Sequence, residues 1–388
     1  MSGRKNILGV LEHMSSNAVT VRPSRCAIVR NRNVTCGKCA SACTSECIHF
    51  EDGTIAVDAS KCVGCGTCAT VCPTCALETH NPGDLELLQE CEAKIADGNV
   101  TIACQQVVNA LENVAKTDLI AEVVCLGRVE ESLTSGLVAA GARTVTLLCG
   151  NCDMCAQKHG RSTAELVCET SNALLKAWES TAQVILVNDV PGYLVADDAC
   201  QEACKDAMAE YFRQERSASP VQADETVQED EDQDEGGAQV LRVMRDGTLP
   251  HFVPDRRERL LDNLSMIGQP KDATIDTRLW GYVVIDGTKC TSCRMCATFC
   301  PTAAIRKFDE EDGTFGVNHS PIDCVKCGSC RDICPEEAIT LVDNVKTGFL
   351  MNGQLHHYVM KPRTVKLNDP QQIFNTMRQH IDGDMYER

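Results

Sequence analysis

The sequence predicts two small α+β domains, each built around clustered cysteines, that flank a central α/β domain with a parallel sheet. Cysteine-rich blocks recur near both ends of the 388-residue chain, at residues 20–80 and 280–342, which indicates an internal repeat. The segment between them alternates apolar strand patterns with helical patterns. We therefore expect a first cysteine domain, the central domain, an acidic linker, a second cysteine domain and a C-terminal extension, at residues 1–88, 89–215, 216–246, 247–345 and 346–388.

Composition limits the role of the 27 cysteines. The apolar patch at residues 7–11 is too short for a signal peptide, and no apolar run reaches the roughly 18 residues of a membrane span. We therefore expect a cytoplasmic protein, and in a reducing cytoplasm clustered cysteines are metal ligands rather than disulfides. The net charge of −18, from 37 basic and 55 acidic residues, argues against nucleic-acid binding.

Two short motifs define the second cysteine block. CTSCRMCATFCP begins at Cys290 and CVKCGSCRDICP begins at Cys324, and both have the spacing C-x2-C-x2-C-x3-C-P. A zinc site usually pairs two C-x2-C hooks across a longer loop, so zinc fits this spacing poorly. The block instead resembles bacterial two-cluster ferredoxins over about sixty residues. In that pattern three cysteines of a run hold one cluster and the fourth crosses to the neighbouring cluster.

This resemblance implies a ferredoxin-like α+β fold and two 4Fe–4S clusters. The two ligand sets are Cys290, Cys293, Cys296 and Cys334 for one cluster, and Cys324, Cys327, Cys330 and Cys300 for the other. Between the motifs, strand-like residues on both sides of Asp312 and Gly313 predict a hairpin. Asp52 and Gly53 predict the same hairpin in the first block, which supports the internal repeat.

The first block contains one complete motif and one altered motif. CVGCGTCATVCP, from Cys62, is complete, whereas CGKCASAC, from Cys36, has Asn33 in place of the first cysteine and Thr44 in place of the proline. Residues 68–75 also have the C-x3-C-x2-C spacing of radical-SAM enzymes, but these cysteines already belong to the ferredoxin pattern.

Cys26, ten residues before Cys36, can supply the missing ligand if the loop between them returns to the same iron. We therefore expect one 4Fe–4S cluster on Cys26, Cys36, Cys39 and Cys72, and another on Cys62, Cys65, Cys68 and Cys43. Cys47 is a rival donor for the vacant position. A cluster held by three thiolates, with an exchangeable fourth ligand, is a further alternative.

Three apolar runs of the central segment, VTIAC, AEVVC and RTVTLLC, each end in a cysteine. Helical patterns follow them, and AQVILVND supplies a fourth strand pattern, so we expect a parallel sheet of the flavodoxin or Rossmann kind with helices on both faces. The carboxyl ends of parallel strands lie at one edge, where ligands bind. Cys104, Cys125 and Cys149 should therefore converge there, joined by Cys152 and Cys155.

VVCLGRVEESL and LLCGNCDMCA make this domain similar, over about a hundred residues, to the iron–sulfur delta subunit of methyl-viologen-reducing hydrogenase. That family links hydrogenases or other dehydrogenases to heterodisulfide-reductase-like flavoproteins, so the resemblance implies a 2Fe–2S cluster and partners of these kinds. This chain departs from the family near Cys104, where a second cysteine is missing, and in its tight spacing from Cys149 to Cys155. A 4Fe–4S cluster is therefore the alternative.

Residues 217–237, SASPVQADETVQEDEDQDEGG, contain almost no large apolar residue and predict a disordered tether. After the tether, PDRRERLLDNLSMIG predicts a helix that begins near Pro254 and ends at Gly268. DPQQIFNTMRQHIDG predicts another helix in the C-terminal extension. Each helix either packs on its own domain or docks a partner.

These features together predict an iron–sulfur electron-transfer subunit of a multisubunit oxidoreductase. Four 4Fe–4S clusters, with the central cluster between the two pairs, would pass single electrons between a dehydrogenase or hydrogenase and a reductase. No G-x-G-x-x-G fingerprint for a flavin or nicotinamide is evident, so the chemistry at either end is assigned to partner chains. The alternative is a heterodisulfide-reductase-like oxidoreductase that acts on a substrate at the central cysteines. A regulatory or storage protein would not need the second ferredoxin block.

Overall fold

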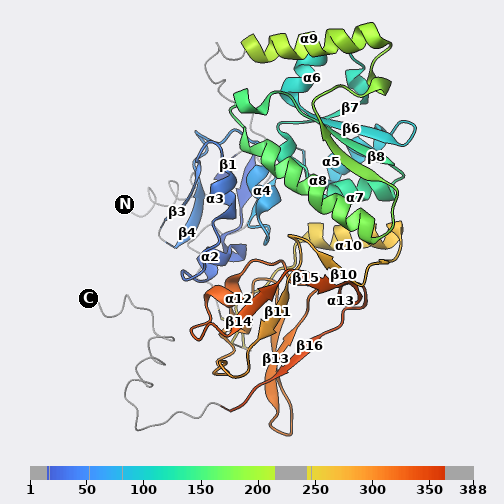
Figure 1. Ribbon diagram of the computed structural model, residues 1–388. Coiled ribbons are helices and arrows are strands. Elements are labelled where there is room, and N and C mark those ends of the chain that lie inside the picture. The colour runs from blue at the N-terminus through green and yellow to red at the C-terminus, as the bar shows by residue number, and fades with distance from the viewer. Residues whose placement is uncertain are drawn as a thin grey trace, which may run out of the picture.

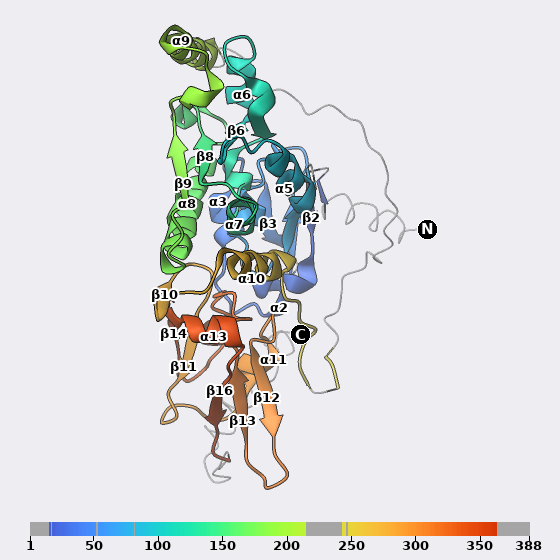
Figure 2. The same ribbon diagram turned by 90° about the vertical axis from the view of Figure 1, so that its right-hand side faces the viewer.

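The computed structural model describes residues 15–214 and 243–362, except for Asn17, Asp52, Asn81 and Asp246. The predicted C-terminal helix and the tether lie outside these residues, and of the acidic linker (216–246) only residues 243–245 are described. We name three parts by their residues: the N block (15–80), the central domain (84–214) and the C block (247–362). The N block lies beside the central domain, and the C block lies beneath both (Figure 1, Figure 2).

The N block consists of short antiparallel strands and short helices around its cysteines. Its strands are β1 (Ser15–Ser16), β2 (Val19–Val21), β3 (Ile48–Glu51), β4 (Thr54–Val57) and β5 (Leu77–Thr79), and its helices are η1 (Pro23–Arg25), α2 (Ala27–Arg30), α3 (Lys38–Ala42) and α4 (Thr67–Val71). Glu51 pairs with Thr54, which confirms the predicted hairpin. Val19, Ile55 and Leu77 pack against buried cysteines, so thiols make up much of this small core.

The C block repeats this plan and adds strands at its edges. Its elements are β10 (Thr274–Asp276), β11 (Tyr282–Ile285), α11 (Met295–Thr298), β12 (Ile305–Asp309), β13 (Phe315–His319), α12 (Ser329–Asp332), β14 (Ile339–Val342), β15 (Asn344–Lys346), α13 (Thr347–Asn352) and β16 (His356–Val359). The predicted hairpin is formed by β12 and β13, whose ends pair at Asp309 and Phe315. Strand β16 extends it on the other side of β13.

The central domain contains the predicted parallel sheet. Its strands are β6 (Asn99–Cys104), β7 (Ile120–Val123), β8 (Thr144–Leu148) and β9 (Gln183–Val187), in the spatial order β7-β6-β8-β9. All three neighbouring pairs are parallel. Because every strand runs the same way, the ends that carry the cysteines lie along one edge.

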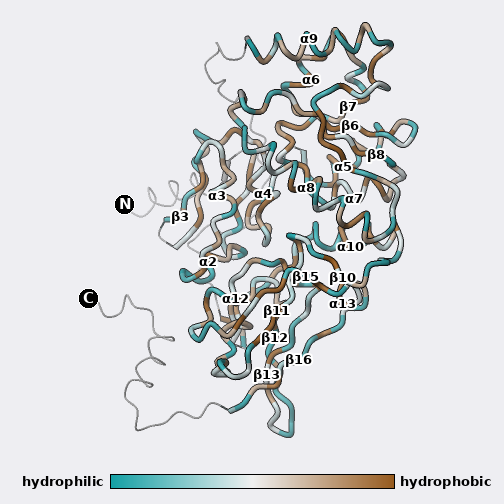
Figure 3. Tube along the Cα trace, viewed as in Figure 1, coloured by the Kyte–Doolittle hydropathy of each residue, from teal (hydrophilic) through white to brown (hydrophobic). Residues whose placement is uncertain are grey.

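Helices cover both faces of this sheet, as expected for a parallel sheet. On one face α5 (Asp84–Ala93), α7 (Glu131–Ala139) and α8 (His159–Ala177) enclose Val100 and Ile102. On the other face α6 (Gln105–Leu111) and α9 (Asp198–Gln214) enclose Ala103 and Leu148. The hydrophobic stretches of the trace follow these strands (Figure 3). Short 3-10 helices complete the loops: η2 (Thr117–Leu119), η3 (Leu126–Arg128), η4 (Cys152–Met154) and η5 (Gly192–Leu194).

Helix α10 (Asp255–Ile267) joins the C block to the central domain. Pro254 precedes its first turn and Gly268 ends it, as the sequence predicts. The helix packs along α7, and its buried Leu260 and Leu264 share an apolar cluster with Trp178 of the central domain. This helix therefore packs on its own domain and on the central domain, and it fixes one against the other. Among the described residues, no helix combines the length and apolarity that a membrane crossing requires.

Candidate metal centres

The four cysteine motifs end in the same backbone conformation. In each motif the residue three positions after the last cysteine adopts a positive φ between 47° and 54°: Glu46, Cys75, Ala303 and Glu337. For a residue with a side chain this left-handed conformation is uncommon, so its repetition marks a shared local fold. The altered motif of the N block therefore folds like the complete motifs at its C-terminal end, although Thr44 replaces the proline.

The altered motif differs at its start. In the complete motifs the residue after the second cysteine has a positive φ, 74° at Gly66, 56° at Arg294 and 86° at Gly328. Gly37, the equivalent residue of the altered motif, has a φ of −121°. The tight loop between the first two cysteines is therefore replaced, and the chain reaches Cys36 from helix α2, which Cys26 precedes.

The cysteines of the C block line two separate cavities. We call Cys290, Cys293, Cys296 and Cys334 the outer C set, and these four line one cavity. We call Cys300, Cys324, Cys327 and Cys330 the inner C set, and these four line the other. The two groups are those expected from the ferredoxin pattern, with the last cysteine of each motif crossing to the other cavity. Ala338 N donates a hydrogen bond to the Cys334 sulfur at 3.3 Å, as protein amides do around cluster sulfurs.

Burial makes the protein alone a poor environment for thiolates. Burial, with a smaller contribution from the neighbouring Cys300 thiol, raises the pKa of Cys324 to about 11 and that of Cys327 to about 12. A thiolate is the ligand form, so positive charge must be supplied to this cavity before the cysteines ionise. Iron supplies that charge when a cluster is bound.

The cysteines of the N block also fall into two groups. We call Cys26, Cys36, Cys39 and Cys72 the inner N set, and Cys43, Cys62, Cys65 and Cys68 the outer N set. Burial, with smaller contributions from the Cys72 and Cys36 thiols, raises the pKa of Cys26 to about 11. Burial likewise raises the pKa of Cys65, and the Cys43 and Cys62 thiols add to this. Cys26 thus lies among the inner set, where the sequence assigned it; the ligand roles themselves stay predictions.

Cys47 lies with the outer N set. Its sulfur is 3.4 Å from that of Cys43, and its hydrogen bond lowers the pKa of Cys43 to about 5. Cys47 follows Cys43 by four residues, in the position that Ala76 holds after Cys72, and Ala76 N donates to the Cys72 sulfur at 3.3 Å. Because the altered motif makes the same turn, Cys47 lies beside the outer N set, which already has four cysteines, and not beside Cys26.

The donor sets of the C block suit a 4Fe–4S cluster. The four thiols of each C set surround a cavity. Four thiolates around such a space are the donors that a 4Fe–4S cluster requires.

All five predicted cysteines of the central domain line one cavity at the carboxyl edge of the sheet. They lie at the ends of β6, β7 and β8 and in or directly after η4, and they form the central set: Cys104, Cys125, Cys149, Cys152 and Cys155. Gly160 lies against the Cys125 sulfur, since a Cβ atom there would be 2.1 Å from it. The topology of the sheet therefore brings together residues that are far apart in the sequence.

Arg161 supplies positive charge to the central set. Its Nη1 donates to the Cys149 sulfur at 3.3 Å and to Asn188 Oδ1 at 3.4 Å. A hydrogen bond from Cys152 lowers the pKa of Cys149, and Arg161 lowers it further, whereas burial raises the pKa of Cys104 to about 11. Within the central set, the hydrogen bond from Cys152 and the charge of Arg161 therefore favour the thiolate form of Cys149. The sequence interpretation did not identify Arg161, which no spacing rule links to the cysteines.

Comparison with known proteins supports the ferredoxin interpretation of both blocks. Residues 289–338 match the 4Fe-4S dicluster domain family, and residues 55–78 match the 4Fe-4S binding domain family. Ferredoxin-type 4Fe–4S segments therefore lie near both ends. The matched part of the N block contains the complete motif and leaves out the altered one. No curated protein matches the chain significantly.

The N block contacts the C block directly between their inner sets. Arg30, which is 5 % exposed, donates to the carbonyl oxygens of Phe299 at 3.4 Å and Cys300 at 3.3 Å. Thr35 donates from its N and Oγ1 to Asp332 Oδ2, at 3.0 and 2.8 Å. Burial lowers the pKa of Arg30, whereas the Cys300 and Cys327 thiols raise it. A buried cation therefore lies where the two blocks meet.

The N block also contacts the central domain beside the outer N set. Helix α4, which carries Cys68, packs against η3, and a side chain at Gly127 would collide with Thr67. After burial, the Cys65 thiol is among the groups that raise the pKa of Cys125. Thr44 Oγ1 accepts a hydrogen bond from His159 N at 3.2 Å. The outer N set is thus the neighbour of the central set.

Proposed function

We propose that this chain is an electron-transfer subunit in which the five cysteine sets form one continuous row. A bound iron–sulfur cluster supplies one-electron oxidation and reduction. The row runs from the outer C set through the inner C set, the inner N set and the outer N set to the central set. Within each block the two sets are neighbours. Burial is the main cause that raises the pKa of Cys68 and of Cys330, and the smaller causes include one thiol of the neighbouring set, Cys39 for Cys68 and Cys296 for Cys330.

The single observation that carries this order is the contact between the inner N and inner C sets at Arg30. From the sequence we expected the central site to lie between the two ferredoxin pairs. The direct contact of the blocks supports a different order, in which the central site is one end of the row. An electron can then pass between the two blocks without passing through the central site.

The finer assignment extends the resemblance of the central domain. Its strand order, with the first strand between the second and the third, is that of flavodoxin-like sheets. Together with the convergence of its five cysteines, this order supports a domain of the hydrogenase-delta kind that holds a 2Fe–2S or 4Fe–4S cluster. We therefore propose a hydrogenase or dehydrogenase and a heterodisulfide-reductase-like flavoprotein as the partners, in the cytoplasm.

Arg30 provides the test of the row. A fixed positive charge stabilises the added electron on either side of the contact, so Arg30→Gln should shift the midpoint potentials of two clusters downward, with iron and sulfide contents unchanged. Arg30→Lys keeps the charge and should restore most of the shift. The measurement is an anaerobic redox titration followed by EPR, including the magnetic interaction between clusters of the two blocks.

Arg25→Gln is the matched control. Arg25 also joins the two blocks, because its guanidinium lies 3.4 Å from the centre of the Phe252 ring. Its hydrogen bonds go to Glu78 and to the Cys75 carbonyl oxygen, both in the N block, whereas Arg30 donates to Cys300 of the inner C set. The control should leave the potentials of the C-block clusters as in the parent, because Arg25 donates only within the N block. Potentials that are the same in the parent and in Arg30→Gln, with no magnetic interaction between the blocks, would refute the proposed order.

A further inference from the structure

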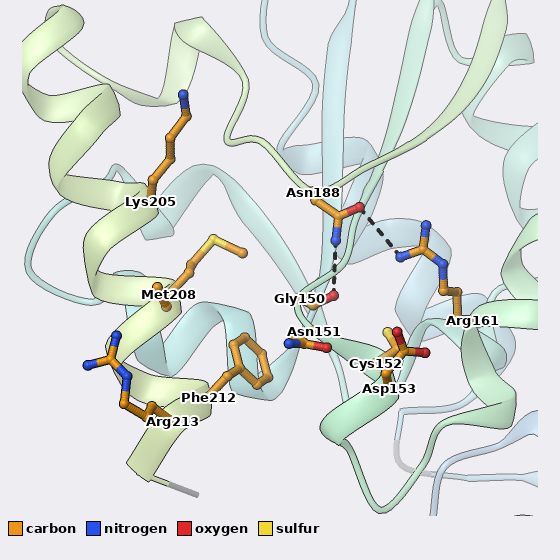
Figure 4. A pocket seen from close by; sticks show the side chains of 11 residues that line it. Gly150, Asn151, Cys152, Asp153, Arg161, Asn188, Lys205, Met208, Phe212 and Arg213 are labelled. Carbon is orange, nitrogen blue, oxygen red and sulfur yellow. Dashed lines mark hydrogen bonds between the residues drawn. The ribbon is translucent and has the colours of Figure 1, made fainter. Parts of the chain in front are cut away.

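A wide cavity opens beside the central set, between the loop after β8 and helix α9 (Figure 4). Its volume is about 610 Å³, within the range of small-molecule sites. On one side lie Arg161 and Asn188, and on the other lie side chains of α9 (Figure 4). The Asn188 amide donates to the carbonyl oxygens of Cys149 and Gly150, at 3.3 and 3.0 Å, and so fixes the loop that forms the wall.

The cavity is continuous with the central site. Five residues line both this cavity and the smaller one that holds the cysteines: Gly150, Asn151, Cys152, Arg161 and Phe212. Phe212 packs against the backbone at Gly150, where a Cβ atom would lie 2.1 Å from its ring. A molecule in the cavity would therefore lie directly beside the end of the row, with Cys152 and Arg161 at the boundary.

The lining is cationic, in contrast to the net charge of the chain. Arg161, Lys205 and Arg213 line the cavity with one carboxylate, that of Asp153. Lys205 lies 3.8 Å from Glu202, Arg161 lies 2.9 Å from Glu165, and Arg213 pairs with Glu210. Exposed pairs of this kind leave the cations available to a ligand at little cost.

Helix α9 adds an apolar wall to these charges. Met208 and Phe212 follow Lys205 at helical spacing and line the cavity between Lys205 and Arg213. The cavity thus combines an apolar, partly aromatic surface with cations at its rim, which suits a flat apolar body that carries acidic groups.

We propose that this cavity binds a redox-active organic anion, with its flat body on Met208 and Phe212 and its acidic groups toward Lys205, Arg213 and Arg161. This inference rests on the proposed function, because only a redox row that ends here gives the anion an electron donor. For a quinone anion the balance is complete: two electrons, supplied one at a time by the reduced protein, and two protons from water yield the hydroquinone.

The first test measures binding to the intact, cluster-loaded, oxidised protein. The probe is anthraquinone-2,6-disulfonate, a flat dianion, and the measurement is anaerobic calorimetric titration. The double variant Lys205→Glu/Arg213→Glu should weaken binding about tenfold, because two favourable rim charges become repulsive. Binding should also weaken as salt is raised.

The matched control reverses two exposed cations elsewhere on the protein. Lys271 and Arg306 are each 61 % exposed, and Lys271→Glu/Arg306→Glu changes the net charge by the same amount. This control should bind the probe as the parent does. Equal weakening in both double variants would show that net charge alone governs binding, and equal affinity in all three proteins would show that the probe binds elsewhere; either result overturns the proposal.

The second test asks whether the bound anion takes electrons. The cavity variant, reduced beforehand with dithionite, should be reoxidised about tenfold more slowly than the parent by a subsaturating concentration of the disulfonate. Its reaction with the cation methyl viologen should not slow. Weaker binding without slower reoxidation would overturn the redox role of the site. Failure here leaves the row itself intact, since the Arg30 variants test that row without any added anion.

Discussion

The two ferredoxin-type blocks share a plan but differ at one motif, and the difference lies where they meet. The C block has two complete motifs, and its eight cysteines line two cavities. In the N block the predicted first ligand of the altered motif, Cys26, lies ten residues before Cys36, in place of the usual three. The residues of that step form α2 and the loop after it, which provide Arg30, Val34 and Thr35 to the contact with the C block.

The comparison teaches that the altered motif supplies the docking surface. A complete C-x2-C loop has only two residues between its cysteines, both needed to turn the chain around the cluster. The longer step frees a helical turn, so that Ala27 and Val34 can pack on Ile333 of the C block. The altered motif, which in the sequence looks as if it has lost a ligand, thus places the inner N set beside the inner C set.

The largest effect is expected from the cysteine that begins this step. Cys26→Ser should remove about four irons per chain and the EPR signal of one cluster, because three thiolates hold a 4Fe–4S cluster poorly. Cys47→Ser is the comparison variant and should retain the full iron content, since Cys47 lies beside Cys43. The reverse pattern, iron lost with Cys47 and kept with Cys26, would assign the ligand to the rival.

The total iron content per chain shows how much iron the central site adds to that of the two blocks. The parent should contain about eighteen irons with a central 2Fe–2S cluster, or about twenty with a central 4Fe–4S cluster. Gly160→Ala should remove the central share, about two or four irons, because the added carbon would lie 2.1 Å from the Cys125 sulfur. Gly192→Ala, where no atom would lie within 4 Å, is the control and should keep the parent value. A Gly160→Ala protein with full iron would mean that Cys125 is not needed.

A smaller effect is expected at the contact itself. Asp332→Ala removes the acceptor of two hydrogen bonds from Thr35 and should weaken the contact by about 1–3 kcal/mol, without loss of iron. Faster hydrogen exchange at residues 27–35 is the measurement. Asp309→Ala, which removes only the exposed partner of Arg294, is the control and should leave exchange at these residues unchanged. Unchanged exchange in Asp332→Ala as well would mean that the blocks are held together elsewhere.

What the sequence could predict depends on how local the signal was. The spacing of each motif is a local signal, so the hairpins, the groups of cysteines in the C block and the parallel sheet were predictable. The convergence of the central set followed from strand polarity alone, since Cys104, Cys125 and Cys149 end neighbouring strands. The order of the parts was not predictable, because it depends on contacts such as Arg30 with Cys300, 270 residues apart, for which the sequence has no periodic signal.

Helix α10 shows the same limit. The sequence predicts its start at Pro254, its leucine stripe and its end at Gly268, but it does not predict that the helix packs on α7. Nor could the sequence reveal that Arg256 donates to the carbonyl oxygen of Ala69, at 2.8 Å, and to that of Cys72, and so holds the loop of the complete N-block motif. A helical stripe shows that a face is buried but not against which surface.

The smallest expected effect compares equivalent buried positions in the two blocks. Val57 and His319 each lie five residues before the first cysteine of a complete motif, and both are buried. Burial, with a smaller contribution from the cross-strand His356, lowers the pKa of His319 to about 4, and Tyr282 packs on the ring at 5.6 Å. The unfolded chain, with a pKa near 6.5, takes up the proton first on acidification. The stability that is fully present above about pH 6.5 is therefore lost as the pH falls toward 4.

His319→Val gives the C block the residue of the N block and should remove this dependence. From about pH 7.5 to about pH 5.5 the parent should lose about 1 kcal/mol more unfolding free energy than the variant, since one unit of pKa difference corresponds to about 1.4 kcal/mol. The measurement is the change in unfolding temperature between the two pH values, which is independent of any shift in stability caused by the smaller side chain. His357→Val, on the exposed side of β16, should behave as the parent does. Equal slopes for all three proteins would mean that His319 takes up its proton equally readily in the folded and the unfolded chain.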